Sequence, residues 1–156
     1  MRTAISIAAG PRHGLALLST GNVKAWGDNS YGELGDGTTA DRMVARSVAG
    51  MGDVKAVAAG SLFSLALLGD GTVRAWGRNV DGQLGDGTTT NRSLPVPVVG
   101  LPGRVSAIAA GSNFALALLA NGGVMAWGSN DQGSSGWAGP TSTRIPSRSP
   151  SRYPVL

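Results

Sequence analysis

Few side chains in this sequence could carry out acid–base or metal chemistry. His13 is the only histidine among the 156 residues, and the chain contains no cysteine. The positions that correspond to His13 in two further copies of the same sequence pattern are Phe63 and Phe114, so this position accepts an apolar ring. Because a metal or catalytic site needs several converging groups, we interpret His13 as a packing residue. We expect no metal ligand and no cofactor.

A second candidate for chemistry is a short oxygen-rich segment that occurs twice. Asp36-Gly37-Thr38-Thr39 and Asp86-Gly87-Thr88-Thr89 each combine one carboxylate with two hydroxyls. A calcium loop needs more oxygen ligands converging in one turn. Asp, Gly and Thr are also residues that build tight turns through local hydrogen bonds. The segment therefore favours turn formation over cation binding.

Motifs for catalysis are missing from the printed sequence. Serine, histidine and aspartate all occur, but no nucleophile-elbow pattern accompanies the lone histidine. No glycine-rich stretch has the spacing of a phosphate-binding loop followed by lysine. We therefore expect a protein that is not an enzyme and has no catalytic residues.

The strands and loops that carry His13 and the Asp-Gly-Thr-Thr segments are predicted from an internal sequence repeat. The triplet Ala-Ala-Gly ends at Gly10, Gly60 and Gly111, which gives a period of 50 and then 51 residues. The extra residue lies in the loop 100–103, where glycine and proline tolerate insertion. The segment 73–92 nearly copies the segment 23–42. Such a period indicates a modular array.

Each repeat unit predicts four short strands. Asp-Gly or Asn-Gly between the second and third apolar runs favours a hairpin, with the type I′ turn as the expected connection. Pro95 and Pro97 cannot donate to a central ladder, so the fourth strand belongs at a sheet edge. The expected runs are the Ala-Ala-Gly run, Leu15 to Leu18, Val23 to Trp26, and Ala45 to Ala49, with Pro95 to Val99 as the second copy of the last.

The fold class follows from the burial that these strands require. The middle strands are apolar on both faces, so each small sheet needs a neighbour on either side, as in a β-propeller or another stacked array. The small residues of the Ala-Ala-Gly strand suit the crowded innermost position. We therefore expect an all-β, propeller-type repeat array of about three four-stranded blades.

The combined pattern resembles the regulator of chromosome condensation repeat, including its bacterial members. The residues that carry the resemblance are Ala8-Ala9-Gly10 with His13, Trp26-Gly27-Asp28-Asn29 and Gly32 to Gly37, with their later copies, over about residues 3–133. The resemblance implies a seven-bladed propeller in which Trp26, Trp76 and Trp127 pack between blades. It implies no single function, because members include a nucleotide-exchange factor, an ultraviolet photoreceptor and inhibitors of β-lactamase.

The domain boundaries expected from the repeats are 3–54, 55–105 and an incomplete 106–133. Three repeats correspond to part of a seven-bladed propeller. After Gly133 the pattern gives way to a segment, 134–156, that is rich in Ser, Pro and Arg. One hypothesis is a frame-shifted end, because loss of one nucleotide near codon 133 would explain a lost Gln-Leu-Gly. The other is a disordered Ser/Pro/Arg-rich tail.

Charge and hydropathy narrow the range of partners. The net charge is +4, with 13 Lys and Arg residues. Three of these, Arg144, Arg148 and Arg152, lie in the segment 134–156, so the rest of the chain is nearly neutral. We therefore do not expect a nucleic-acid partner. The apolar run near the N-terminus aligns with the repeat, and no stretch is long enough to span a membrane. The default compartment is the cytoplasm, or the exterior if the true N-terminus lies upstream.

Candidate binding residues are those that differ between copies while their frame stays constant. The asparagines at 29, 79 and 130 recur, whereas the residues around them change. Variable loop positions on a constant scaffold favour partner contact, although drift in solvated loops gives the same pattern. The candidates are Asp28, Ser30, Tyr31, Arg78, Val80 and Asp81.

These observations predict a non-enzymatic scaffold for protein–protein interaction. Regulation of an enzyme, by guanine-nucleotide exchange or by β-lactamase inhibition, is an alternative that the resemblance allows. A truncated fragment without a function of its own is another. We also expect self-association, because an open arc of blades leaves two apolar faces uncovered.

Overall fold

The computed structural model describes residues 3–130 and 142–143, and every regular element in them is a strand. The first sheet contains β1 (Ala4–Ala9), β2 (His13–Leu18), β3 (Val23–Gly27) and β4 (Arg42–Ser47). The second contains β5 (Val54–Ala59), β6 (Phe63–Leu68), β7 (Val73–Gly77) and β8 (Arg92–Pro97). The third contains β9 (Val105–Ala110), β10 (Phe114–Leu119), β11 (Val124–Ser129) and β12 (Ser142–Thr143). The all-β class is confirmed.

Each sheet is a four-stranded antiparallel meander with its strands in chain order. The register repeats with the sequence, since His13 pairs with Gly27, Phe63 with Gly77 and Phe114 with Gly128. β8 lies at the edge of its sheet, as its two prolines predict. The short strand β12 falls within the segment 134–156, and the rest of that segment lies outside the described residues.

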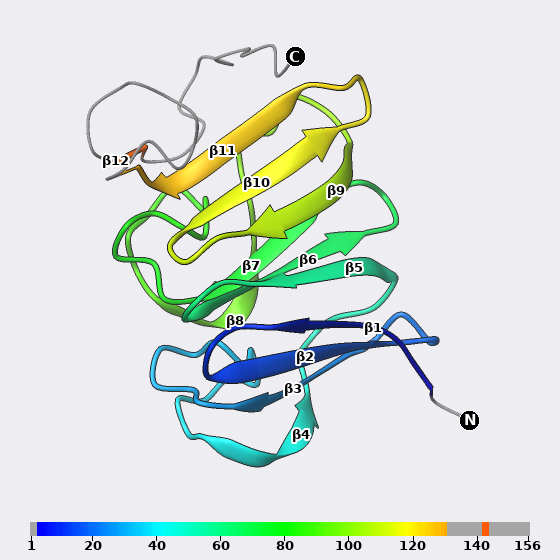
Figure 1. Cartoon of the computed structure of the whole chain (residues 1–156), viewed down its shortest axis with the longest axis vertical. Helices are drawn as coiled ribbons and strands as arrows, with labels where there is room; N and C mark the ends of the chain where they lie inside the picture. Colours follow the sequence, from blue (N-terminus) through cyan, green and yellow to red (C-terminus); the bar gives the residue numbers. More distant parts are fainter. Residues whose placement is uncertain (1–2, 131–141, 144–156) are drawn as a thin grey trace.

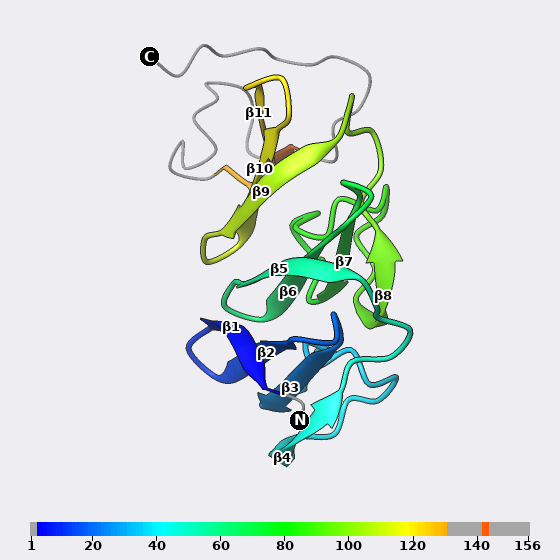
Figure 2. The ribbon, with the colours of Figure 1, turned by 90° about the vertical axis from the view of Figure 1, so that its right-hand side faces the viewer.

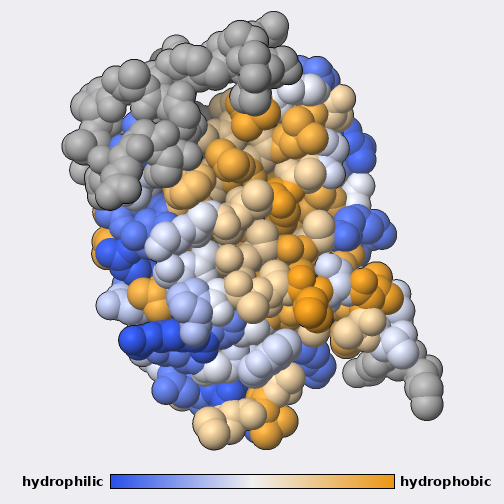
Figure 3. All heavy atoms as spheres, viewed as in Figure 1, coloured by the Kyte–Doolittle hydropathy of each residue, from blue (hydrophilic) through white to orange (hydrophobic). Residues whose placement is uncertain are grey.

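The three sheets stack in the order of the sequence (Figures 1 and 2). The first strands of the sheets lie side by side, with β1 next to β5 and β5 next to β9. This is the arrangement expected if the Ala-rich strands are innermost, because their small side chains allow close approach. Apolar surface runs along this row of strands in Figure 3.

The hairpin between the second and third strand of each sheet forms as predicted, but its turn is different. Gly21 and Gly71 have φ of 79° and 84°, whereas Thr20 and Asp70 before them do not have positive φ. The amide of Gly21 donates a hydrogen bond to the carbonyl of Leu18 at 2.9 Å. A type I turn followed by one glycine with positive φ is the common three-residue hairpin loop. A type I′ turn needs positive φ at two consecutive residues, so the prediction of a type I′ turn was wrong.

The fourth strand also differs from its expected limits. It begins at Arg42 instead of Ala45 and ends at Ser47 instead of Ala49. The early start has a physical reason: a bulge in the ladder brings Arg42 opposite Gly27, so pairing continues up to the long loop. Val48 still donates to the carbonyl of Val23 at 3.0 Å, just beyond the regular strand.

The hydrophobic core lies between the sheets. We call the face turned toward the preceding sheet the leading face and the face turned toward the following sheet the trailing face. Leu15, Leu17, Val23 and Ala25 form the trailing face of the first sheet, and they pack against the leading-face residues Ala66 and Trp76 of the second. The same contact recurs between the second and third sheets, where Leu65, Leu67, Val73 and Ala75 pack against Ala115, Ala117, Leu119, Met125 and Trp127.

The middle strands β2 and β6 are buried on both faces for nearly their whole length. For β6, the apolar character on both sides follows from its position inside the stack of sheets. No helix in the described part of the chain is long and apolar enough to cross a membrane.

Candidate binding loops

In the first and second sheets, the long loop after the third strand is organised by one buried asparagine. Asn79 is fully buried, and its Nδ2 donates to the carboxylate of Asp86 and to the carbonyls of Thr88 and Thr90 at 3.0–3.1 Å. Its Oδ1 accepts from the amide of Leu84 at 3.0 Å. Asn29 makes the corresponding bonds in the first sheet. The constant asparagine therefore fixes the loop on which the variable residues lie.

The Asp-Gly-Thr-Thr segment stabilises the far side of the same loop. Asp36 accepts hydrogen bonds from the amide and hydroxyl of Thr38 at 3.0 and 2.6 Å, and it pairs with Arg42 Nε at 2.8 Å. Burial alone would raise the pKa of Asp36, but the bonds from Thr38 and Arg42 hold this pKa below its ordinary value. Both carboxylate oxygens are thus used for turn formation.

Tryptophans tie each loop to the next sheet. Trp76 Nε1 donates to the carbonyl of Glu33 at 2.8 Å, and Trp127 Nε1 donates to the carbonyl of Gln83 at 3.0 Å. The indole of Trp76 lies against Gly35, where an added Cβ would come within 2.9 Å of the ring. These contacts show the predicted role of Trp76 and Trp127 in packing between blades.

His13 takes part in a buried contact between the first two sheets. Its Nε2 lies 2.9 Å from the hydroxyl of Ser64, and that hydroxyl donates to the carbonyl of Glu33 at 2.8 Å. Because Ser64 uses its proton on the carbonyl, His13 serves as the donor to Ser64. Burial lowers the pKa of His13 to about 4, although the nearby charge of Asp28 raises it slightly. The arrangement does not activate the serine as a nucleophile.

Three of the predicted binding residues line one pocket between the first and second sheets. Asp28, Ser30 and Tyr31 face it from the first sheet, and Ser61 and Leu62 face it from the second. The pocket has a volume of about 380 Å³. Pro11 and Arg12 complete its lining.

Charges in this pocket are partly neutralised. Arg12 Nη1 lies 3.4 Å from the carboxylate of Asp28, and Arg12 is largely exposed. The hydroxyl of Ser30 donates to Asp28 at 2.7 Å, and this bond, followed by the amide of Ser30, lowers the pKa of Asp28. The Asp28 carboxylate is therefore ionised and lies beside an exposed cation.

The other three predicted residues lie on the corresponding loop of the second sheet. Arg78 Nη1 pairs with Asp81 at 2.8 Å and also approaches Asn113 Oδ1 of the third sheet at 3.3 Å. Val80 is 49% exposed between them. These three residues therefore occupy the second loop in the way that Asp28, Ser30 and Tyr31 occupy the first.

Both groups lie at the same end of the stack. The amides of Asp28 and Arg78 bond the carbonyls of Arg12 and Leu62, which belong to the turns between the first and second strands. The hydroxyls of Ser61 and Ser112 meet at 2.8 Å across neighbouring sheets. The loops of adjacent repeats consequently form one surface.

The turn residues of this surface were not predicted from the sequence. Arg12, Ser61 and Leu62 line the pocket, although they were not among the candidates. A signal was available, because Pro11-Arg12 becomes Ser61-Leu62 and then Ser112-Asn113 in the aligned copies. Position 12 differs in all three copies, as positions 28, 30 and 31 do, and position 11 differs in the first copy.

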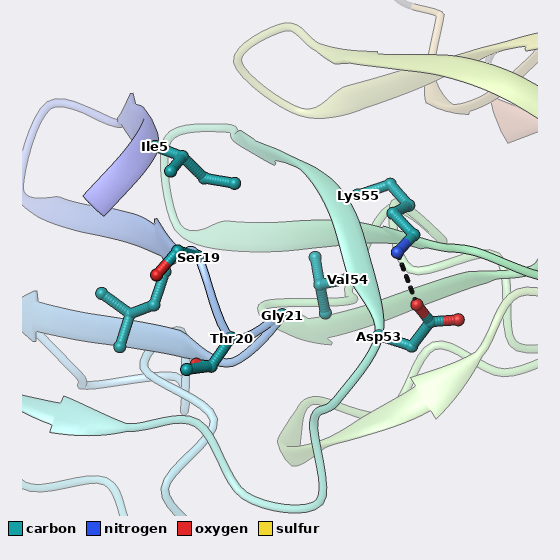
Figure 4. A pocket seen from close by; sticks show the side chains of 8 residues that line it. Ile5, Ser19, Thr20, Gly21, Asp53, Val54 and Lys55 are labelled. Atoms are coloured by element: carbon teal, nitrogen blue, oxygen red, sulfur yellow. Dashed lines mark ion pairs between the residues drawn. The ribbon is translucent and has the colours of Figure 1, made fainter. Parts of the chain in front are cut away.

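A smaller pocket lies at the opposite end, beside the hairpin turns. Its volume is about 200 Å³, and it is lined by Ile5, Ser19, Thr20 and Lys55 among others (Figure 4). The dashed line in Figure 4 marks the ion pair between Lys55 and Asp53, at 2.6 Å. None of the predicted binding residues lies in this pocket.

Metal-ligating groups do not cluster in residues 3–130. No set of three or more His, Asp or Glu side chains in the described part of the chain is placed to hold a metal ion.

Solved structures share this arrangement of sheets. Human WBSCR16 is 27% identical, with a TM-score of 0.81 over 92% of this chain and 38% of its own. Prp20p from Saccharomyces cerevisiae is 25% identical, with a TM-score of 0.77 over 91% of this chain and 37% of its own. The ectodomain of the Physcomitrella patens receptor kinase CR4 is 21% identical, with a TM-score of 0.53 over 81% of this chain and 30% of its own, and shows likeness of fold alone.

The chain spans less than two-fifths of the length of WBSCR16 and of Prp20p, 38% and 37% respectively. It is therefore of the size of a fragment of such a propeller. A family model described as the regulator of chromosome condensation (RCC1) repeat matches residues 20–67 and 70–118. A second model with the same description matches residues 4–33, 54–83 and 105–134. Because these matches cover more than half of the sequence, the chain belongs to the regulator of chromosome condensation repeat family.

Proposed function

We propose that the chain recognises a protein partner through the loop surface formed by Arg12, Asp28, Tyr31, Leu62 and Arg78, with their neighbours in the same loops. The observation that carries the proposal is the pocket of about 380 Å³ in which loops of two adjacent sheets meet. Its lining combines an exposed aromatic ring, an apolar side chain and charged groups. Aromatic and Arg side chains are the residues that most often contribute strongly to protein interfaces.

Two further observations support a binding role without catalysis. The variable side chains of this surface are carried by a constant frame of buried asparagines, so they can change without loss of the fold. Proteins of this repeat family are generally binding or regulatory, and the similar protein Prp20p has binding properties to Gsp1p and histones. The partner of this chain is proposed only as a protein.

The proposal is tested by capturing proteins from the source cells and measuring direct binding with the purified partner. Tyr31→Ala removes the ring from the pocket, and Arg78→Glu reverses a charge of the second loop. Each change is expected to weaken binding at least about tenfold, the effect of losing one strong interface residue. Isothermal titration calorimetry would give the dissociation constants.

Matched controls lie at the opposite end of the same sheets. Thr20→Ala and Lys55→Glu alter the pocket beside the hairpin turns, and they are expected to leave the dissociation constant unchanged. If the Thr20 and Lys55 variants weaken binding while the Tyr31 and Arg78 variants do not, the loop surface is not the binding site. Loss of binding in none of the four variants would also contradict the proposal.

A further inference from the structure

The turns of the first and second sheets lack a polar link that joins the turns of the second and third. The amide of Ser61 donates to the carbonyl of Ser112 at 3.0 Å, and the two hydroxyls meet at 2.8 Å. The residue that corresponds to Ser61 in the first sheet is Pro11, which has neither an amide hydrogen nor a hydroxyl. The turns are nonetheless close, since a Cβ added at Gly10 would clash with the carbonyl of Gly60. Residue type, and not separation, therefore prevents the link.

A second link is lost for the same kind of reason. Arg78 Nη1 lies 3.3 Å from Asn113 Oδ1 across the boundary between the second and third sheets. The corresponding residues at the first boundary are Asp28 and Leu62, whose side chains cannot form a hydrogen bond with each other. The pocket of about 380 Å³ thus lies at a boundary that lacks both links.

This pocket offers hydrogen-bond acceptors to an incoming group. Asp28 Oδ1 accepts from the amide and hydroxyl of Ser30 at 2.9 and 2.7 Å, and these bonds keep the carboxylate ionised. Among the described residues, Asp28 Oδ2 is approached only by Arg12 Nη1. No described residue donates to the carbonyl of Ser61, which also lines the pocket. A negative charge and a carbonyl are therefore available to a donor.

Arg12 holds the Asp28 carboxylate weakly. The distance from Nη1 to Oδ2 is 3.4 Å, whereas charge-assisted N–H···O bonds are about 2.7–2.9 Å long. The ion pair between Arg42 and Asp36, by comparison, measures 2.8 Å. The Arg12 side chain is also 70% exposed, and exposed ion pairs contribute little free energy. A cation from another protein can therefore replace Arg12 at Asp28.

Aromatic and apolar groups line the pocket beside the same carboxylate. Tyr31 is 37% exposed, and it lines the pocket together with Pro11 and Leu62. An aromatic ring attracts a cation placed over its face. The methylene stem of Lys or Arg packs on apolar groups while its charged head reaches a polar partner. Since a cavity of about 150 Å³ holds benzene, the volume of about 380 Å³ admits one long side chain.

We propose that this pocket accepts a cationic side chain of the protein partner, a lysine or an arginine, whose charged head displaces Arg12 and pairs with Asp28. The inference rests on the proposed function and adds the chemistry of the contact. Tyr31 and Leu62 flank the stem of the incoming side chain. An acidic side chain fits less well, because the Asp28 carboxylate would repel it.

A short peptide tests the pocket without the partner. The probe is a blocked pentapeptide with one arginine among glycines, and its control carries citrulline, which has nearly the same shape without the charge. Nuclear magnetic resonance titration of the full chain should shift the amides of Ser30, Tyr31, Ser61 and Leu62 with the arginine peptide. The citrulline peptide should bind at least about tenfold more weakly. Added salt should weaken binding of the arginine peptide.

Two substitutions separate the charge of Asp28 from the shape of its loop. Asp28→Asn keeps the oxygen that accepts from Ser30 and removes the charge, so it should weaken binding of the arginine peptide at least about tenfold. Arg12→Ala removes the competing cation and should strengthen binding about threefold.

The matched control is Asp70→Asn. Asp70 accepts from the amide and hydroxyl of Thr72 just as Asp28 accepts from those of Ser30, but it lies in a hairpin turn at the opposite end of the second sheet. Asp70→Asn removes the same charge from the same kind of turn and should leave binding of the arginine peptide unchanged. Equal weakening by Asp28→Asn and Asp70→Asn would show that overall charge, and not the pocket, attracts the peptide, and would overturn the inference.

Other outcomes also decide the matter. Equal binding of the arginine and citrulline peptides, binding of neither, or tighter binding of a glutamate peptide overturns the inference. These outcomes leave the proposed function standing, because the Tyr31 and Arg78 variants test it with the partner itself. With the purified partner, Asp28→Asn should weaken binding at least about tenfold and Arg12→Ala should strengthen it. A partner that requires Tyr31 but tolerates Asp28→Asn overturns the cationic contact alone.

Discussion

At the scale of single residues, the most informative side chain is His13. It occupies a position that carries phenylalanine in the other two repeats, and it combines ring packing with a hydrogen bond to Ser64. Its Nδ1 is buried and has no partner among the described residues. The imidazole is therefore neutral in the folded state, and protonation of this buried ring opposes folding.

Replacing His13 with Phe should make the stability of the chain less sensitive to acid. The pKa of His13 is about 4 in the folded state and 6.5 as the ordinary value, so the unfolded state binds the proton more tightly. The contribution of His13 is complete above about pH 6.5 and is lost as the pH falls toward 4, by about 3 kcal/mol in total. Urea unfolding at pH 7, 5.5 and 4 gives the difference between the two proteins.

Ser64 keeps its bond to the carbonyl of Glu33 in the His13→Phe variant, so the variant should be nearly as stable as the wild type at pH 7. The difference should then grow in favour of phenylalanine as the pH is lowered. Parallel stability curves for the two proteins between pH 7 and 4 would show that the ring does not titrate in this way.

Glu33 and its counterpart Gln83 provide a second test at this scale. Both are fully buried, and both accept a hydrogen bond from a loop amide, Tyr31 and Asp81 respectively. Burial raises the pKa of Glu33 above its ordinary value. Since the folded state then binds the proton more tightly, stability from Glu33 is present in acid and is lost as the pH rises through the folded pKa.

Glu33→Gln should therefore raise the melting temperature at pH 7, and the gain should shrink toward acidic pH. The reciprocal change, Gln83→Glu, buries a new carboxylate near Asp81 and should lower the melting temperature at pH 7. Differential scanning calorimetry of both variants at pH 7 and 4.5 measures the effects. If Glu33→Gln lowers the melting temperature at pH 7, the burial of its charge is not destabilising.

At the scale of elements, the loops are held in shape by their own polar groups, not by apolar packing alone. In the loops of the first and second sheets, one buried asparagine bonds residues that lie up to 11 positions away in the sequence. A long loop with such internal bonds presents its variable residues in a defined geometry. The constant Asn and the Asp-Gly-Thr-Thr segment are thus the frame on which recognition depends.

Asn79→Asp should destabilise the second loop strongly. The aspartate can still accept from the amide of Leu84, but it cannot donate to the carbonyls of Thr88 and Thr90, and it would face the carboxylate of Asp86. Loss of these buried bonds is expected to lower the free energy of unfolding by about 3 kcal/mol.

The matched control for Asn79→Asp is Thr89→Asp, which adds the same carboxylate to an exposed position of the same loop. This control should change the free energy of unfolding by less than about 0.5 kcal/mol. Guanidinium unfolding followed by circular dichroism measures both. Equal effects of the two substitutions would mean that added negative charge, and not the asparagine network, determines the outcome.

At the scale of the whole molecule, each sheet contacts only its neighbours in the sequence. The two core clusters lie on either side of the second sheet, so that, within residues 3–130, the second sheet is covered on both faces and the first and third on one face each. In arrays of this kind stability is close to a sum of units and their interfaces. The middle sheet should therefore open last.

Amide hydrogen exchange should show this order under conditions in which the chain is monomeric. The amides of β6 and β7 are expected to exchange more slowly than those of β2, β3, β10 and β11, because opening the second sheet disrupts two interfaces. Exchange measured by mass spectrometry of peptides resolves the sheets. Protection of β2 or β10 equal to that of β6 would contradict the unequal coverage of the sheets.

Much of the candidate site could be predicted, because variation between copies points to loop positions without knowledge of the structure. Asp28, Ser30 and Tyr31 were selected in this way, and the structure places all three in one pocket. The turn residues Arg12 and Leu62 were missed, since their approach to that pocket depends on the stacking of two sheets. The shared hydrogen bond of His13 with Ser64 was missed for the same reason, because these residues are 51 positions apart.

The sequence alone determined the number of repeats, the four-strand order of each unit and the edge position of the proline-containing strand. These properties depend on local signals that recur, such as paired apolar runs, turn glycines and a missing amide hydrogen. Only the tertiary structure decided which face of each sheet is covered, which tryptophans find a carbonyl and which of them remains exposed. Coverage depends on how many sheets stand beside a given sheet, and identical residues such as Trp26 and Trp76 therefore have different environments.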